Sequence, residues 1–299
     1  MRIVLIDSGF GGMNIASGLY ETIKDRTDVE IIFVNGLPHE KYGYNSINKT
    51  EDKANILNDL LLNVDVKLAP DLIVIACNTL SVLLNKTDII KNIRHKIVDI
   101  IQFGTHYVYE QYKSDSDCLL AVMGSNTTIE SDVHRRYFLK YSHIFKDIIT
   151  VSATELIGSV EKNVSGKKTN ELIRKYIKTV ENYLSPNKER FTKIILILAC
   201  THFSYATNIF KKALEKLHFP YDIVDPNGFM TDYLSKKILQ KENYNRGNVS
   251  FRIISKTVIE KDMQDSIGRL IEKTSPELKR ALRNYEYAPD LFSPEKYII

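Results

Sequence analysis

Residues 70–79, PDLIVIACNT, and the similar stretch at residues 192–201, TKIILILACT, decide the fold class of this chain. Each is an apolar run rich in β-branched residues that ends in Ala-Cys and then a threonine. Such a run predicts a buried strand that ends at a thiol. The two cysteines, Cys77 and Cys200, are 123 residues apart, which is close to one domain length. Two copies of this unit predict two lobes that face each other, with one cysteine on each wall.

The rest of the chain alternates between strand and helix patterns, which is typical of an α/β fold with parallel sheets. We therefore expect two pseudo-symmetric lobes, each with a mostly parallel sheet flanked by helices, and an active site in the cleft between them. The tail beyond Thr274 is charged and contains three prolines, so we expect it to wrap the surface. Strands are predicted at 2–6, 30–34, 72–76, 118–123, 148–151, 194–198, 221–224 and 249–254, and helices at 13–24, 49–66, 130–141, 167–184 and up to 239.

Composition excludes several classes of protein. Hydrophobic residues make up 43% of the 299 residues and charged residues 26%, which suits a folded core rather than a disordered chain. The net charge is only +4, and the lysines are scattered among acids, so no nucleic-acid partner is expected. Apolar runs are too short to span a bilayer, and Asp7 interrupts any signal peptide, which predicts a cytoplasmic protein without a membrane partner. The three cysteines include no CxxC pair, so neither a disulfide framework nor a zinc site is expected.

The strand-end cysteines indicate nucleophile or base chemistry, because ligands of parallel sheets bind at the carboxyl ends of strands. A following helix N-terminus favours the thiolate, so we expect thiol pKa values below the usual value of about 8.5. Cys118 lies inside an apolar run and is expected to be a buried structural residue. Glycine-rich turns at residues 7–12, DSGFGG, and 124–128, GSNTT, can hold a carboxylate. Since neither a cofactor lysine nor a metal cluster is visible, the pattern points to cofactor-independent proton transfer at carbon.

Four motifs, at residues 7–12, 76–79, 124–128 and 200–203, together resemble those of the aspartate/glutamate racemase superfamily, and most of all glutamate racemase. The resemblance covers roughly residues 1 to 255. It implies interconversion of L- and D-glutamate without a cofactor, in which one cysteine removes the Cα proton and the other protonates the opposite face. It also implies a role in supplying D-glutamate for peptidoglycan, and a discontinuous first lobe. The expected lobes are residues 1–103 plus 225–299, and 104–224.

The resemblance also implies a role for each site residue. Cys77 and Cys200 would be the two bases, with Asp7 assisting the first and both Glu161 and His202 assisting the second. Backbone N–H groups at Tyr42 and Gly43 would hold the side-chain carboxylate of the substrate. The residues that would bind its amino and carboxylate groups are Ser8, Asn78, Thr79, Thr128 and Thr201. The partner is then a small amino acid, and a homodimer is left open.

The chain departs from the family pattern chiefly in the loop that would select the substrate. Lys41 replaces a proline before Tyr42, and Gly36 replaces an acidic residue. Lys41 either turns inward and favours an acidic substrate or points to solvent. Smaller departures are Ser125 in place of a threonine, Ala199 in place of a glycine, and Phe203-Ser204 in place of Tyr-Pro.

Other functions remain open on the sequence alone. The substrate could be another amino acid such as aspartate, or the scaffold could bind an amino acid without catalysis. Cys200 and His202 alone would suit a cysteine hydrolase, but that leaves Cys77 without a role. Related decarboxylases keep only the second cysteine, so Cys77 counts against them as well.

Overall fold

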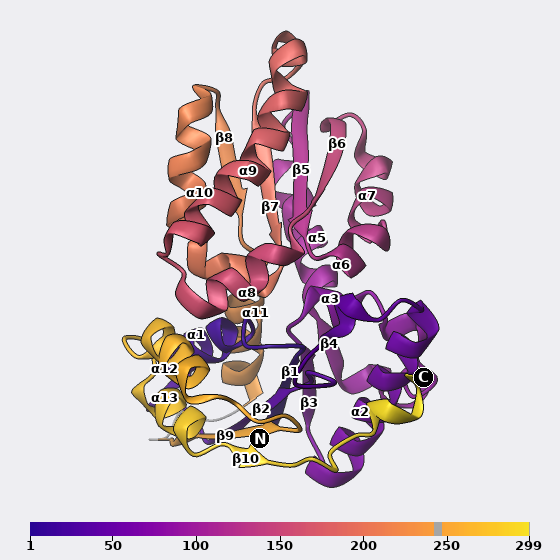
Figure 1. The fold of residues 1–299 in the computed structure, drawn as a ribbon, viewed down its shortest axis with the longest axis vertical. Helices are drawn as coiled ribbons and strands as arrows, with labels where there is room; N and C mark the ends of the chain where they lie inside the picture. The colour runs from indigo at the N-terminus through magenta and orange to yellow at the C-terminus, as the bar shows by residue number, and fades with distance from the viewer. Residues whose placement is uncertain (242–246, 299) are drawn as a thin grey trace. The chain divides into compact units, whose positions relative to one another are not determined.

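The computed structural model describes residues 1–241 and 247–298, so residues 242–246 and 299 of the predicted first lobe lie outside the described part. The chain divides into two compact units. Unit 1 comprises Met1–Ile100 and Asn227–Ile299, and unit 2 comprises Ile101–Pro226. In unit 1 the N-terminal and C-terminal segments lie side by side, as the indigo and yellow ribbons show (Figure 1).

Unit 1 is built on a six-stranded sheet in the order β10-β9-β2-β1-β3-β4, and all its strand pairings are parallel. A short 3₁₀ helix, η1 (Tyr44–Ser46), lies in the loop after β2. The strands and α-helices that begin in unit 1, or at its boundary with unit 2, are β1 (Arg2–Asp7), α1 (Met13–Ile23), β2 (Val29–Asn35), α2 (Thr50–Leu68), β3 (Leu72–Ile75), α3 (Asn78–Ser81), α4 (Ile90–Ile93), β4 (Ile97–Asp99), α11 (Pro226–Lys241), β9 (Val249–Ser255), α12 (Lys261–Ile271), α13 (Pro276–Arg283) and β10 (Glu286–Tyr287).

Unit 2 is built on a four-stranded sheet in the order β6-β5-β7-β8, again with parallel pairings. A 3₁₀ helix, η6 (Thr201–Ala206), follows β7. The other elements are α5 (Ile100–Tyr112), β5 (Cys118–Gly124), α6 (Asn126–Glu130), α7 (Val133–Phe138), β6 (Phe145–Ser152), α8 (Thr154–Asn163), α9 (Lys167–Leu184), β7 (Ile194–Ala199), α10 (Thr207–Leu214) and β8 (Tyr221–Val224).

The two sheets share one topology. Across the sheet of unit 1, four neighbouring strands follow the order β2-β1-β3-β4. The four strands of unit 2 follow the equivalent order, β6-β5-β7-β8. Helices flank both sheets (Figure 1), and the central strands β1, β3, β5 and β7 are almost wholly buried, as expected of strands covered on both faces. The prediction of an α/β fold with two parallel sheets is confirmed.

Two expectations about local structure are wrong. The single helix predicted over 130–141 is two short helices, α6 and α7, because the backbone at Asp132 adopts a left-handed conformation with φ of 56°. The tail does more than wrap the surface. It forms α13 and β10, and it buries Leu278, Leu282 and Phe292. Burial of these large apolar side chains stabilises the attachment of the tail.

Candidate active site

The shared topology places each predicted thiol at the same point of its sheet. In an open parallel sheet, ligands bind beyond the carboxyl ends of the strands where the strand order reverses. That point lies between β1 and β3 in unit 1 and between β5 and β7 in unit 2. Cys77 follows the end of β3, and Cys200 follows the end of β7 directly. The predicted positions of both cysteines at strand ends are confirmed.

In unit 1, Cys77 lies beside the turn that follows β1. Its Sγ is 3.1 Å from Ser8 Oγ, and either group can donate the hydrogen bond. Asp7 is fully buried, and its carboxylate accepts hydrogen bonds from the backbone N–H groups of Gly9 and Gly12 at 3.0 and 2.8 Å. A side chain at Gly12 would bring a Cβ within 2.9 Å of Ala76 Cβ and 3.0 Å of Asp7 Oδ2, so this approach requires glycine. The turn therefore fixes Asp7 and Ser8 next to the thiol.

The environment of Cys77 raises its pKa to about 12, which contradicts the expectation of a lowered value. Burial is the main cause, because it disfavours the charged thiolate, and the negative charge of Asp7 adds to it. Hydrogen bonds from Ser8 and from the Leu80 backbone act in the opposite direction but are outweighed. In the protein without substrate, Cys77 is therefore a thiol at neutral pH.

Asn78 and Thr79, which come directly after Cys77, are both buried. Within the described residues, neither the Oδ1 nor the Nδ2 of Asn78 has a hydrogen-bond partner. Buried amides are almost always hydrogen-bonded, so a group with two unused ends is suited to binding a polar ligand. The backbone places it next to the thiol.

The loop between β2 and α2 carries the predicted carboxylate-binding residues. The Tyr42 ring stacks on His39 with 4.4 Å between ring centroids, and Tyr42 packs against the core cluster that contains Cys77. Gly43 precedes η1 in an extended conformation with φ of −106°. The Lys41 side chain is exposed, so of the two orientations open from the sequence, the structure has the one toward solvent. Gly36, at the end of β2, fits closely against Leu60, where a Cβ would lie 2.9 Å from Leu60 Cδ2.

In unit 2, Cys200, His202 and Glu161 form a connected chain of side chains. Cys200 Sγ lies 3.7 Å from His202 Nδ1, and His202 Nε2 lies 2.7 Å from Glu161 Oε1. Burial alone lowers the pKa of His202, but the charge of Glu161 and the hydrogen bonds to Cys200 and Glu161 outweigh it, and the pKa is raised well above its usual value. The imidazole is thus held as a cation between a carboxylate and a thiol.

The hydroxyls that resemblance assigns to substrate binding in unit 2 lie at the ends of β5 and β7. Ser125 caps α6, where its Oγ accepts from the Thr128 N–H at 3.4 Å and lies 3.0 Å from Thr128 Oγ1. Thr201 is buried next to Cys200. At Gly124 a Cβ would lie 2.9 Å from the Ala199 carbonyl oxygen, so glycine allows the two strand ends to approach. Every predicted site residue thus lies at the carboxyl edge of a sheet or in a loop or helix beside it.

Cys118, expected to be structural, is fully buried in β5, and burial raises the pKa of its thiol. Sequence reasoning missed Tyr44, which is buried beside Cys77 in the same core cluster. Its signal was weak, since it consisted only of an aromatic residue directly after the predicted carboxylate-binding pair, Tyr42 and Gly43.

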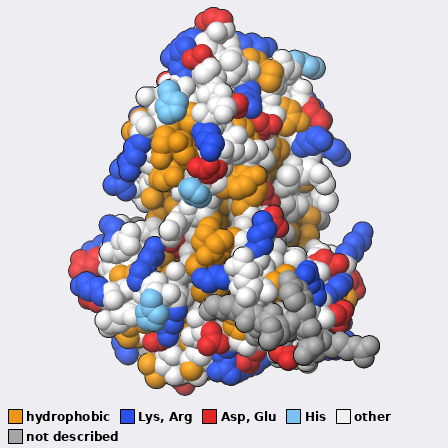
Figure 2. All heavy atoms as spheres, turned by 180° about the vertical axis from the view of Figure 1, so that it is seen from behind, with side chains coloured by type: hydrophobic (Ala, Val, Ile, Leu, Met, Phe, Trp, Pro, Cys, Tyr) orange, Lys and Arg blue, Asp and Glu red, His pale blue; other side chains and the backbone are white. Residues whose placement is uncertain are grey.

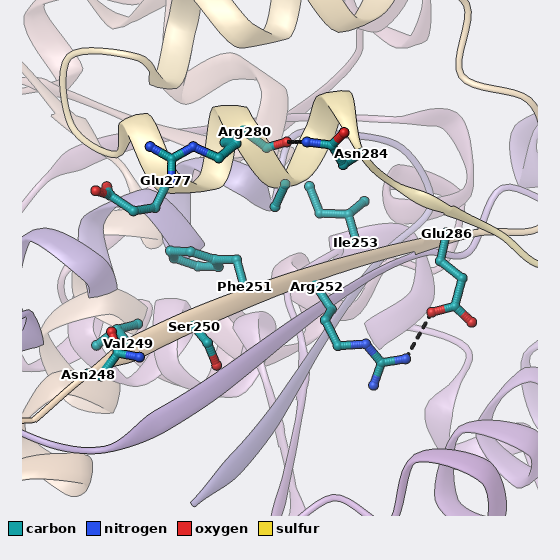
Figure 3. Close-up of a pocket in the computed structure, with 11 residues that line it drawn as sticks. Asn248, Val249, Ser250, Phe251, Arg252, Ile253, Glu277, Arg280, Asn284 and Glu286 are labelled. Carbon is teal, nitrogen blue, oxygen red and sulfur yellow. Dashed lines mark hydrogen bonds and ion pairs between the residues drawn. The ribbon is translucent and has the colours of Figure 1, made fainter.

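A cavity also lies outside the predicted site, in unit 1. A cavity of about 510 Å³ lies along β9 beneath α13 (Figure 3), where β10 pairs with only the last two residues of β9. Arg252 and Glu286, 2.8 Å apart, place charges on this open edge, as sheets commonly do to prevent strand addition. None of the predicted site residues lines this cavity.

On the face shown in Figure 2, basic and acidic side chains are interspersed. Across residues 1–241 and 247–298, no three His, Cys, Asp or Glu side chains are grouped to hold a metal ion. In the same residues, no helix has both the length and the apolar composition of a membrane-spanning segment.

Known proteins are similar to this chain, with its two parallel sheets and a thiol at the same strand end in each unit. No protein-family model matches the chain. The curated glutamate racemase of Carboxydothermus hydrogenoformans is 23% identical over 260 residues, which cover 85% of this chain and 86% of that protein. The glutamate racemase of Lactobacillus acidophilus is 28% identical over 236 residues, covering 77% and 78%.

The fold agrees with these relatives. A crystal structure of glutamate racemase from Francisella tularensis in complex with D-glutamate superposes with a TM-score of 0.67 at 18% identity, covering 91% of this chain and 93% of that one. The chain is thus similar in sequence to glutamate racemases, which are amino-acid racemases and isomerases, and similar in fold to a solved member of that group. Its curated homologues are glutamate racemases, so the resemblance expected from the motifs is confirmed.

Proposed function

We propose that this protein is a cofactor-independent glutamate racemase that uses Cys77 and Cys200 as its two bases. The observation that carries the proposal is the repeated position of the thiols. Each follows the third strand of a sheet with the same strand order, at the point where ligands bind, and each has polar partners within its own unit. The names of the homologues and the D-glutamate in the Francisella structure support glutamate as the substrate.

In the proposed reaction, one proton leaves one face of the α-carbon and another proton is added to the opposite face. One cysteine, as thiolate, takes the Cα proton, and the electron pair stays on the substrate as a carbanion. The other cysteine, as thiol, gives its proton to the opposite face, so the product is the enantiomer and the two cysteines exchange protonation states. The mechanism requires each sulfur to lie about 3–3.5 Å from the α-carbon, on opposite faces, so the two sulfurs would be at most about 7 Å apart in the bound state.

The partners of each thiol suit this exchange. His202, held as a cation by Glu161, can stabilise the Cys200 thiolate and can return a proton to it. The pKa of Cys77 is raised by burial and by Asp7, and the ammonium group of a bound amino acid would lower it, since a nearby positive charge favours the thiolate. We propose that Asp7 accepts the proton of the Cys77 thiol when the thiolate forms and returns it afterwards. The N–H groups of Tyr42 and Gly43 would bind the side-chain carboxylate of the substrate. Its amino and α-carboxylate groups would be bound by Ser8, Asn78, Thr79, Thr128 and Thr201.

Deuterium exchange tests this function. In D₂O, L- and D-glutamate should each gain deuterium at the α-carbon, which NMR or mass spectrometry measures. Each should also lose optical purity, which polarimetry measures. Cys77→Ser and Cys200→Ser should each nearly abolish racemisation, because an alcohol is far too weak an acid to supply the base. Cys118→Ser is the matched control and should racemise at the wild-type rate. Undiminished racemisation by Cys77→Ser would exclude the two-base mechanism.

The same experiment separates the alternatives. Exchange with aspartate or another amino acid, but not with glutamate, would keep the chemistry and change the substrate. Binding of glutamate without any exchange would indicate a non-catalytic amino-acid-binding protein. We propose a supply of D-glutamate for peptidoglycan as the cellular role, which depletion of the protein and rescue by added D-glutamate would test.

A further inference from the structure

We propose that the hydroxyl of Tyr44 donates a hydrogen bond to the side-chain carboxylate of the substrate and so helps to select a dicarboxylic amino acid. The proposal rests on the racemase function proposed above and adds a specificity-determining residue to it. Two observations carry it. The hydroxyl is buried without a hydrogen-bond partner among the described residues, and Tyr44 directly follows the pair Tyr42 and Gly43 that we assign to the same carboxylate.

The first observation concerns the hydroxyl. Tyr44 is 1% exposed and is among the largest fully buried side chains of the described chain. Its Oη has no hydrogen-bond partner within the described residues. Burial of an unbonded hydroxyl costs stability that a phenylalanine would avoid. A tyrosine at this position is therefore explained best by a ligand that satisfies the hydroxyl when it binds.

The second observation concerns position. Tyr44 is the first residue of η1, whose turn is closed by the hydrogen bond from the Ser46 N–H to the Gly43 carbonyl at 3.0 Å. It packs in the hydrophobic cluster that also contains Cys77 and Leu80. The hydroxyl does not bond to the Cys77 thiol. Burial raises the pKa of Tyr44, and negative charges on Cys77 and Asp59 raise it further. The Tyr44 hydroxyl and the Cys77 thiol are thus near each other without a hydrogen bond between them.

The polar groups around Cys77 complement an amino acid with a second carboxylate. The Asn78 amide supplies one unused donor and one unused acceptor next to the thiol. The raised pKa keeps Tyr44 protonated, so its hydroxyl is a donor at neutral pH. A carboxylate accepts such a bond strongly, whereas a neutral aliphatic side chain would leave the hydroxyl unsatisfied.

The substitution Tyr44→Phe tests this proposal because it removes one oxygen and keeps the ring. Steady-state α-deuterium exchange gives kcat and KM for glutamate and for glutamine, which has the same shape without the charge. We expect KM for glutamate to rise about tenfold with a smaller change in kcat, and the preference for glutamate over glutamine to fall about tenfold, as loss of one hydrogen bond to a charged group implies. The melting temperature should be unchanged or higher, because no bond within the protein is lost.

The control is Tyr176→Phe, a buried tyrosine in α9 of unit 2 that is not one of the proposed site residues. It should leave both kinetic constants unchanged. If the wild type racemises glutamate and Tyr44→Phe has wild-type KM and selectivity, this proposal is overturned while the racemase function stands. A lower melting temperature with a loss of kcat and no change in selectivity would also overturn it, because it would show a structural role. A wild type that does not exchange glutamate overturns both proposals.

Discussion

Replacement of Asp7 by asparagine should make Cys77 more reactive while it makes the enzyme slower. Cys77 is buried next to the fully buried carboxylate of Asp7, and both features raise the pKa of its thiol to about 12. The substitution keeps the size of the side chain and removes its charge. The thiolate of Cys77 then becomes easier to form, whereas the proposed proton transfer through Asp7 is lost.

The magnitude follows from the pKa. A rise from 9.0 to about 12 disfavours the thiolate about a thousandfold, or about 4 kcal/mol at about 1.4 kcal/mol per tenfold change. Burial, the larger cause, is unaffected by the substitution. At an effective dielectric constant of about 20, removal of one nearby charge changes the free-energy difference between thiol and thiolate by about 1–3 kcal/mol. We therefore expect thiolate-dependent alkylation of Cys77 at pH 8 to speed up by about tenfold or more.

The assay is iodoacetamide alkylation between pH 7 and 10, with each cysteine followed by peptide mass spectrometry. In the wild type, the rate at Cys77 should rise tenfold per pH unit without a plateau in this range. In Asp7→Asn it should be faster at every pH, with racemisation reduced. Asp88→Asn is the matched control, because Asp88 is a highly exposed carboxylate of unit 1 that pairs with Lys91 on the surface.

A plateau of the wild-type rate near pH 8 would refute the reasoning, because it would show a thiol pKa close to or below its usual value. Equal alkylation rates in the wild type and Asp7→Asn would refute the part assigned to Asp7. The first result would instead favour the lowered pKa expected from the helix that follows the cysteine, whereas the second would leave burial as the cause of the raised pKa.

Two further predictions concern stability. Gly12→Ala should lower the free energy of unfolding by about 1–3 kcal/mol in urea titrations, because its Cβ would lie 2.9 Å from Ala76 Cβ and would displace the Asp7 carboxylate; an unchanged value would show that the turn can relax. The second involves Glu161→Gln and pH. The pKa of His202 is raised in the folded protein, so its pairing with Glu161 stabilises fully below the unfolded value of about 6.5 and is lost as pH rises through the folded value. The stability difference between wild type and Glu161→Gln should therefore be largest near pH 6 and shrink at higher pH, and a difference that grows with pH would contradict the charged pair.

Much of the fold could be predicted because its signals are local. The continuous β-branched runs that become β3 and β7 must be buried on both faces, and the amphipathic run Lys167–Leu184 forms α9 at the predicted residues. The positions of Cys77 and Cys200 follow from those strands, since a residue just after a buried parallel strand lies at the carboxyl edge of the sheet. The break at Asp132 could not be predicted, because several residue types tolerate either backbone conformation there.

The sequence by itself determined which residues are strand-end thiols and which turns accompany them. Only the tertiary structure decided how these groups behave. The pKa of Cys77 depends on burial and on the charge of Asp7, a residue 70 positions away in the chain, and the cationic state of His202 depends on Glu161 from another helix. The unsatisfied hydroxyl of Tyr44, buried without a hydrogen-bond partner among the described residues, is likewise visible only in the tertiary structure. Strand and helix patterns reflect short-range preferences, whereas desolvation and charge depend on neighbours that distant parts of the chain bring together.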